Sequence, residues 1–317
     1  MRTVAPLHPD AQRVNQIMLE LDASGQPPKD IEGMRAFARR RAARLSAPPP
    51  EIGRIVNTTI PNGAHAVPVR IYYPANADTA PLPAYIYAHG GGFVVGDLDM
   101  VETPCRTVCR DAGVVVVSVD YRLSPEHKFP AGLEDTIAAV RWVIANAGAI
   151  GVDASRLAIG GDSAGGNLAA AASQALGSGG AQPLKFQVLV YPVTDLTCAQ
   201  PSYRELGTGY TLTADRMHAY IKHYLASPDD ARDPRASPLL APSLKGQPPA
   251  LVVLAGLDPL VDEGAAYGRR LQEAGSSVEV HEVSDHMHGF LGWTRESEAA
   301  RGALALIARR LKEHLHA

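Results

Sequence analysis

A serine in a glycine-rich turn, between a predicted strand and a predicted helix, constrains this chain more than any other feature. Residues 157–160 (LAIG) are followed by the turn Gly161 to Gly165 (GDSAG) and then by an alanine-rich stretch. G-x-S-x-G in this setting is typical of a nucleophile elbow, in which small neighbours let the serine adopt a strained backbone conformation. The same pentapeptide is often a plain turn elsewhere, but here the strand and helix around it predict that Ser163 is a nucleophile.

Short apolar runs alternate with helical patterns along most of the chain. Several runs are apolar on both faces, as expected of strands that helices cover on both sides. Helical stripes of apolar residues lie between and after them, for example at 133–144 and 304–315. This alternation predicts a mostly parallel α/β sheet flanked by helices. The predicted strands span residues 69–73, 84–88, 114–119, 157–160, 186–191, 251–255 and 278–283.

The first fifty residues differ from the rest and predict two amphipathic helices. One spans 10–22 with Asp10 as its N-cap, and the other runs from about residue 30 to 45, before a run of three prolines. The second helix is rich in arginine, which is typical of a membrane or RNA patch or of an ordinary solvated face. We favour the solvated face for these arginines, which are Arg35, Arg39, Arg40, Arg41 and Arg44.

An insertion interrupts the alternation between the predicted strands that end at Tyr191 and begin at Leu251. A bare loop of about fifty residues is improbable in a compact domain. Thr213 can cap a helix within it. We expect either a packed surface insertion or a lid, and we favour the lid because the predicted chemistry falls beside it. The predicted organisation is N-terminal helices at 1–50, a core at 51–196 and 248–317, and the insertion at 197–247.

A run of three glycines follows the strand at 84–88, in the segment HGGGF. Backbone amides can approach a ligand closely only where side chains are absent, so the run can present N–H donors to a developing oxyanion, together with the amide of Ala164. A phosphate-binding loop is the rival interpretation. It is disfavoured because no Lys-Ser or Lys-Thr pair ends the run and the spacing G-x-G-x-x-G is absent.

A serine nucleophile needs a base, and the base needs an acid that orients it. His288 lies in a predicted loop just after the strand at 278–283, and His286 is its near competitor. Asp258 follows the strand at 251–255, where ligand-facing residues of a parallel sheet are expected. Asp195 and Asp262 are the alternatives for the acid. The order Ser163, Asp258, His288 is the one that the α/β-hydrolase fold uses.

Composition excludes several classes of function. Thirty basic and 33 acidic side chains give a formal net charge of −3, so no general attraction to nucleic acid is implied. No apolar run approaches the about 20 residues of a membrane helix, and we expect no signal peptide and no stable membrane association. The odd cysteine number and the absence of a C-x2-C spacing predict a reduced, cytoplasmic protein without a metal site; the three are Cys105, Cys109 and Cys198.

The motifs HGGGF, YRLSPEHKFPA, GDSAGG, DPL and HGF occur in the order seen in hormone-sensitive-lipase-like carboxylesterases. The chain resembles that family over about residues 50–293, and the α/β-hydrolase fold is what the resemblance implies. It also implies a triad of Ser163, Asp258 and His288, no cofactor, and a cap made from the N-terminal helices and the insertion. Gly91, Gly92 and Ala164 would be the oxyanion donors, and Tyr210, Leu212 and Met217 would roof the substrate pocket.

The sequence departs from the family pattern in VSDHMHGF, where a glycine is common at the position of Asp285. Plant gibberellin receptors look similar but lack the catalytic histidine, so His288 favours an enzyme over a binding module. We expect an esterase that acts on small molecules with short to medium acyl chains. The alternatives are a catalytically silent small-molecule binder and a hydrolase of amides or lactones, and a homodimer stays open.

Overall fold

A mostly parallel sheet organises the chain. The computed structural model describes residues 5–22, 30–75, 77 and 81–316. They form an eight-stranded sheet in the order β1-β2-β4-β3-β5-β6-β7-β8. β2 pairs antiparallel with β1 and with β4, and the pairs from β4 to β8 are parallel. The strands are β1 (Arg54–Asn62), β2 (His65–Tyr73), β3 (Leu82–Ala88), β4 (Val115–Val119), β5 (Val152–Asp162), β6 (Leu184–Val190), β7 (Ala250–Leu257) and β8 (Val278–Met287).

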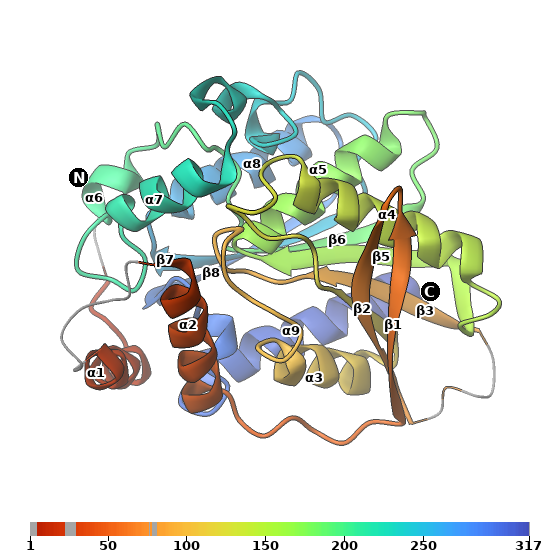
Figure 1. Ribbon diagram of the computed structural model, residues 1–317, viewed down its shortest axis with the longest axis horizontal. Helices are drawn as coiled ribbons and strands as arrows, with labels where there is room; N and C mark the ends of the chain where they lie inside the picture. The colour runs from red at the N-terminus through yellow and green to blue at the C-terminus, as the bar shows by residue number, and fades with distance from the viewer. Residues whose placement is uncertain (1–4, 23–29, 76, 78–80, 317) are drawn as a thin grey trace.

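Helices cover both faces of this sheet, as Figure 1 shows for α3 and α9 on one side and α4, α5 and α8 on the other. α1, α2, α6 and α7 gather at the left end of the molecule in that view. The predicted α/β architecture is therefore confirmed. The helices are α1 (Pro9–Asp22), α2 (Ile31–Leu45), α3 (Glu102–Ala112), α4 (Ala131–Asn146), α5 (Ala164–Gly177), α6 (Ser202–Glu205), α7 (Ala214–Tyr224), α8 (Val261–Glu273) and α9 (Glu298–Leu315).

Two apolar cores result, one on each face of the sheet. Successive side chains of a strand point to opposite faces. In β3, Ile86 accordingly belongs to the core under α4, α5 and α8, while Tyr85 and Tyr87 belong to the core under α3 and α9. Every residue of β4 and β7 is buried. The continuous apolar runs therefore predicted these central strands correctly.

One strand was not predicted, and one predicted N-cap was wrong. β1 was missed because its sequence, RIVNTTIPN, is largely exposed and polar, as an edge strand can be, and it contains Pro61. Asp10 is not an N-cap: α1 begins at Pro9, and the Asp10 carboxylate instead accepts a hydrogen bond from the backbone N–H of Glu298 at 3.0 Å. Thr213, by contrast, caps α7 through a hydrogen bond from the backbone N–H of Arg216, as predicted.

The long insertion between β6 and β7 contains α6, α7 and two short 3-10 helices, η1 (Pro228–Arg232) and η2 (Pro238–Leu240). Asn167 of α5 ties it to the core, because the side-chain amide donates to the carbonyl oxygens of Val193 and Ala236. Among the described residues, no helix combines the length and the apolar character that crossing a membrane requires.

Candidate active site

Ser163 occupies the turn between β5 and α5. Its backbone has φ 56° and ψ −118°, a region that is strained for a residue with a side chain. The turn holds because the backbone N–H of Ser163 donates to the Val190 carbonyl of β6 at 2.8 Å. A Cβ atom on Gly161 or Gly165 would collide with the carbonyl oxygen of Ala88. The glycines of GDSAG are thus required by close backbone packing against β3.

His288 lies between Ser163 and Asp258. β8 ends at Met287, so His288 is the first residue beyond the strand. Its Nε2 lies 2.8 Å from the Oγ of Ser163, and its Nδ1 lies 2.6 Å from the Oδ2 of Asp258. Asp258 is fully buried, and its Oδ1 accepts a hydrogen bond from the Leu260 N–H at 2.9 Å. The structure therefore brings these three predicted site residues into one hydrogen-bonded chain.

The two alternative acids lie elsewhere. Asp195 is buried, and its Oδ1 accepts hydrogen bonds from the backbone N–H and the hydroxyl of Thr197. Asp262 is in the first turn of α8, where its carboxylate accepts from the backbone N–H of Ser202. Both carboxylates connect the core to the insertion, whereas the carboxylate that is hydrogen-bonded to His288 is that of Asp258.

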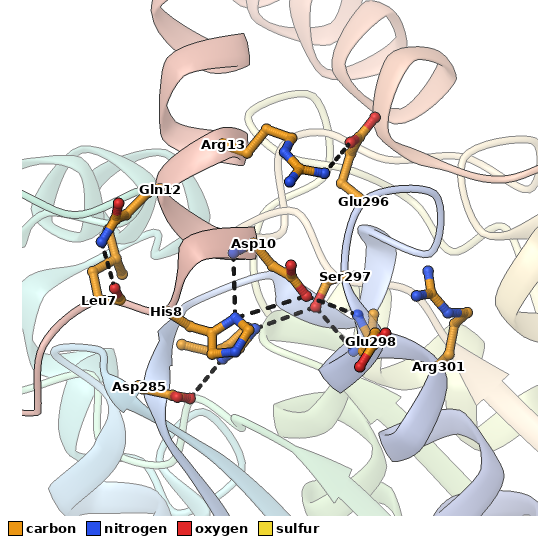
Figure 2. Close-up of polar contacts among 12 residues, drawn as sticks. Leu7, His8, Asp10, Gln12, Arg13, Asp285, Glu296, Ser297, Glu298 and Arg301 are labelled. Atoms are coloured by element: carbon orange, nitrogen blue, oxygen red, sulfur yellow. Dashed lines mark hydrogen bonds and ion pairs between the residues drawn. The ribbon is translucent and has the colours of Figure 1, made fainter.

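His286 has other partners than Ser163. Its Nδ1 lies 2.8 Å from the Asp285 carboxylate, its Nε2 lies 3.2 Å from the Ser297 hydroxyl, and its ring is 2% exposed. Figure 2 shows Asp285 and Ser297 beside His8 of the N-terminal segment. The His8 ring stacks on the His286 ring with centroids 5.0 Å apart. These contacts connect the N-terminal segment to the end of β8.

A metal ion is one further use for this cluster, since ligand atoms of His8, Asp10 and His286 lie within 4.8 Å of one another. Both ring nitrogens of His286 are already hydrogen-bonded, and the two imidazole rings are stacked with an interplanar angle of 29°. Stacked rings direct their nitrogen lone pairs alongside one another rather than toward a common centre. We therefore assign no metal to these residues.

The glycine loop after β3 adopts left-handed backbone conformations, with φ 132° at Gly91 and 61° at Gly92. A Cβ on Gly92 would overlap the ring of Tyr220, so the ring packs directly on the backbone. Among the described residues, the N–H groups of Gly91, Gly92 and Ala164 donate to no protein acceptor. Free donors of this kind beside Ser163 suit a developing negative charge.

A pocket of about 130 Å³ opens at Ser163 and His288. Of the three predicted roof residues, Leu212 and Met217 line it. Tyr210 is not among the lining residues; it is half-buried and packs against the two apolar cores instead. Several other residues line the pocket that were not predicted from the sequence, among them Met18, Arg41, Arg216, Tyr220 and Trp293.

Some of these pocket-lining residues could have been predicted from their spacing on a helix. Tyr220 lies three residues after Met217 on α7, and residues three apart share a helix face. The interpretation of Arg41 as part of a solvated face was wrong, because its side chain lines the pocket. Burial lowers the pKa of Arg41, and the nearby guanidinium of Arg216 acts in the same direction. The pocket therefore contains two cationic side chains that charge patterning alone did not place there.

A family model described as an alpha/beta hydrolase fold matches residues 85–292. The ethyl acetate hydrolase of Pseudomonas putida is 41% identical over 253 residues, which are 79% of this chain and 80% of that protein. Carboxylesterase NlhH of Mycobacterium tuberculosis is 40% identical over 287 residues, 88% of this chain and 89% of its own. The chain belongs to the α/β hydrolase fold family, in its hormone-sensitive-lipase-like branch, and it is an enzyme of the carboxylesterase class.

Solved esterase structures superpose on this chain over almost its whole length. An ester hydrolase from the metagenome of Lake Arreo, in complex with a bipyridine phosphonate derivative, superposes with a TM-score of 0.92 at 36% identity, covering 98% of this chain and 100% of that one. The hyperthermophilic esterase of Pyrobaculum calidifontis superposes with a TM-score of 0.89 at 38% identity, covering 98% of this chain and 99% of that one.

Proposed function

We propose that the protein hydrolyses carboxylic esters with short to medium acyl chains, through a triad of Ser163, His288 and Asp258. The observation that carries the proposal is the pair of hydrogen bonds at His288, 2.8 Å to the Ser163 hydroxyl and 2.6 Å to the Asp258 carboxylate. Asp258 keeps the imidazole proton on Nδ1, so the unprotonated Nε2 faces the serine and can accept its proton.

The reaction has two stages. Oγ of Ser163 attacks the ester carbonyl carbon while its proton passes to Nε2 of His288. The tetrahedral intermediate collapses, the bond to the alcohol oxygen breaks, and the alcohol leaves with that proton. Water then attacks the acyl-enzyme, gives a proton to His288, and the acid departs as the proton returns to Ser163. The N–H groups of Gly91, Gly92 and Ala164 stabilise both oxyanions.

The volume of the pocket beside Ser163 supports a small substrate. A volume of about 130 Å³ is below the about 300 to 1,000 Å³ of typical drug-sized ligand pockets. Lining residues come from α1, α2 and α7, which supports a cap built from residues 1–50 and 197–247 over a core of 51–196 and 248–317. Leu212 and Met217 supply its apolar roof. The cytoplasmic location and the homodimer stay predictions.

The test is a series of esters of one alcohol with acyl chains of increasing length, together with an amide of the same acid. We expect the highest kcat/KM for short or medium acyl groups and a steep fall for long ones. Rapid mixing with a chromogenic ester should release one equivalent of alcohol per enzyme before steady state, provided that deacylation is slower than acylation. Faster hydrolysis of an emulsified long-chain triglyceride than of a soluble butyrate ester would contradict the proposed substrate range.

A further inference from the structure

Arg41 differs from the other arginines of α2. Arg35, Arg39 and Arg44 each form an ion pair with a carboxylate of another segment, at 2.7, 2.7 and 3.2 Å. Arg41 has no hydrogen bond and no ion pair with any residue that the structure describes, although it lines the pocket beside Ser163. The side chain is half-buried and has no acidic partner in the described part of the chain, so a carboxylate that enters the pocket can bind its guanidinium.

Arg216 adds a second cation to the pocket from another helix. It lies on α7, whereas Arg41 lies on α2, and both line the cavity. The Arg216 guanidinium donates to the carbonyl oxygen of Thr211 at 3.1 Å and has no carboxylate partner in the described part of the chain. Two helices distant in sequence therefore present unneutralised positive charge to one small space.

Asp162 is the acidic residue that lines this pocket. Its Oδ1 accepts hydrogen bonds from the hydroxyl of Tyr87 at 2.5 Å and from the backbone N–H of Gly90 at 2.8 Å. These contacts hold the carboxylate against the start of the glycine loop. The two guanidinium groups and this one carboxylate leave the lining with a net positive charge.

We propose that Arg41 and Arg216 select esters that carry a carboxylate near the scissile bond. The inference rests on the proposed ester hydrolysis and adds a substrate class to it. Guanidinium groups bind carboxylates through charge-assisted, often bidentate hydrogen bonds, which are about twice as strong as neutral ones. Because the pocket is small, the carboxylate of a bound ester lies within a few atoms of the carbonyl that Ser163 attacks.

Matched pairs of esters test the proposal. Monoethyl succinate and ethyl butyrate differ by an acyl-side carboxylate in place of a methyl group. Acetoxyacetate and acetoxyacetamide place the charge on the alcohol side, with a neutral amide of similar shape as reference. The measured quantity is the ratio of kcat/KM for the charged member to that for the neutral member, obtained by titrating the acid released.

We expect the charged member to be the better substrate in at least one pair. Arg41→Gln and Arg216→Gln should each lower that pair's ratio about tenfold, the effect of losing one charge-assisted hydrogen bond. Arg41→Lys should retain part of the preference because it keeps the charge. The matched control is Arg40→Gln, because Arg40 is the exposed neighbour on α2 and does not line the pocket. In this variant the ratio of kcat/KM for the charged ester to that for the neutral ester should equal the wild-type ratio.

Binding to Ser163→Ala protein separates this inference from the proposed reaction, since that variant should hold esters without turnover. Calorimetry should give a lower Kd for the charged ester of the preferred pair, and Arg41→Gln in the same background should raise that Kd about tenfold. A wild-type preference for the neutral member in both pairs, or ratios unchanged in both arginine variants, would overturn the inference while leaving ester hydrolysis standing. If the wild type bound the charged esters selectively but hydrolysed none of them, the proposed ester hydrolysis would be overturned and the charge-selective binding would stand.

Discussion

The Ser163 hydroxyl and the His288 imidazole lie 2.8 Å apart although 125 positions separate them in the chain. Ser163 follows β5 and His288 follows β8, and β6 and β7 lie between these strands in the sheet. Parallel strands place their carboxyl ends at one edge, which is why residues so distant in sequence meet there. The order of the strands in the sheet therefore determines whether the serine and the histidine can meet.

The acid is tested by two conservative changes. Asp258→Asn should lower kcat by about 10⁴-fold with little effect on folding, because an amide at this place favours the wrong imidazole tautomer. Asp195→Asn should change KM or stability more than kcat, since Asp195 bonds to Thr197 instead of His288. Steady-state kinetics with thermal melts distinguishes them. Near-normal kcat in Asp258→Asn together with collapse in Asp195→Asn would transfer the role to Asp195.

The base is tested by three histidine variants. His288→Ala should lower kcat by about 10⁶-fold, as loss of the nucleophile or base does in a serine-protease template. His286→Ala should keep most of kcat but lose about 1 to 3 kcal/mol of unfolding free energy, because the buried ring bonds to Asp285 and Ser297. His281→Ala, at an exposed position of β8, is the matched control. A larger kcat loss in His286→Ala than in His288→Ala would refute the assignment.

Glu263 predicts a pH effect on stability. The side chain is fully buried, its Oε1 accepts from the backbone N–H groups of Thr194 and Asp195, and burial raises its pKa well above the usual value. The folded state thus favours the protonated form, so the contribution of Glu263 to stability is greatest below the unfolded pKa of about 4.3 and is lost as the pH rises through the folded pKa.

Glu263→Gln keeps an Oε1 acceptor and removes the charge. The melting temperature of this variant minus that of the wild type should therefore increase between pH 4.5 and pH 8. Chemical melts at the same pH values give the corresponding free energies. A difference that stays constant with pH would mean that ionisation of Glu263 does not oppose folding.

The three thiols should take no part in catalysis. Burial raises the pKa of Cys109 and of Cys198 to about 12 and also raises that of Cys105, so at pH 8 all three are protonated. Thiolate is the reactive form. Iodoacetamide at pH 8 should leave esterase activity unchanged while an active-site-directed phosphonate abolishes it. Rapid inactivation by iodoacetamide would identify a reactive cysteine that this account lacks.

Much of the fold was predictable because the central strands are continuous apolar runs, and the sheet order then placed Ser163, Asp258 and His288 at one edge. The edge strand β1 was not predictable in this way, since exposed strands carry no such signal. Arg41 was misassigned for a different reason. Which face of an arginine-rich helix meets the core depends on tertiary packing, and α2 turns Arg41 into the pocket while Arg40 stays exposed.

Mapping the covalent adduct of a phosphonate ester tests the central claim most directly. The account predicts one equivalent of label, on the peptide that contains Ser163, with loss of activity in proportion to labelling. Ser163→Ala protein should take up no label while keeping the wild-type melting profile, because only a hydroxyl is removed from a small buried site. Label on any other residue of active enzyme, or undiminished labelling of Ser163→Ala, would contradict the assignment of Ser163 as the nucleophile.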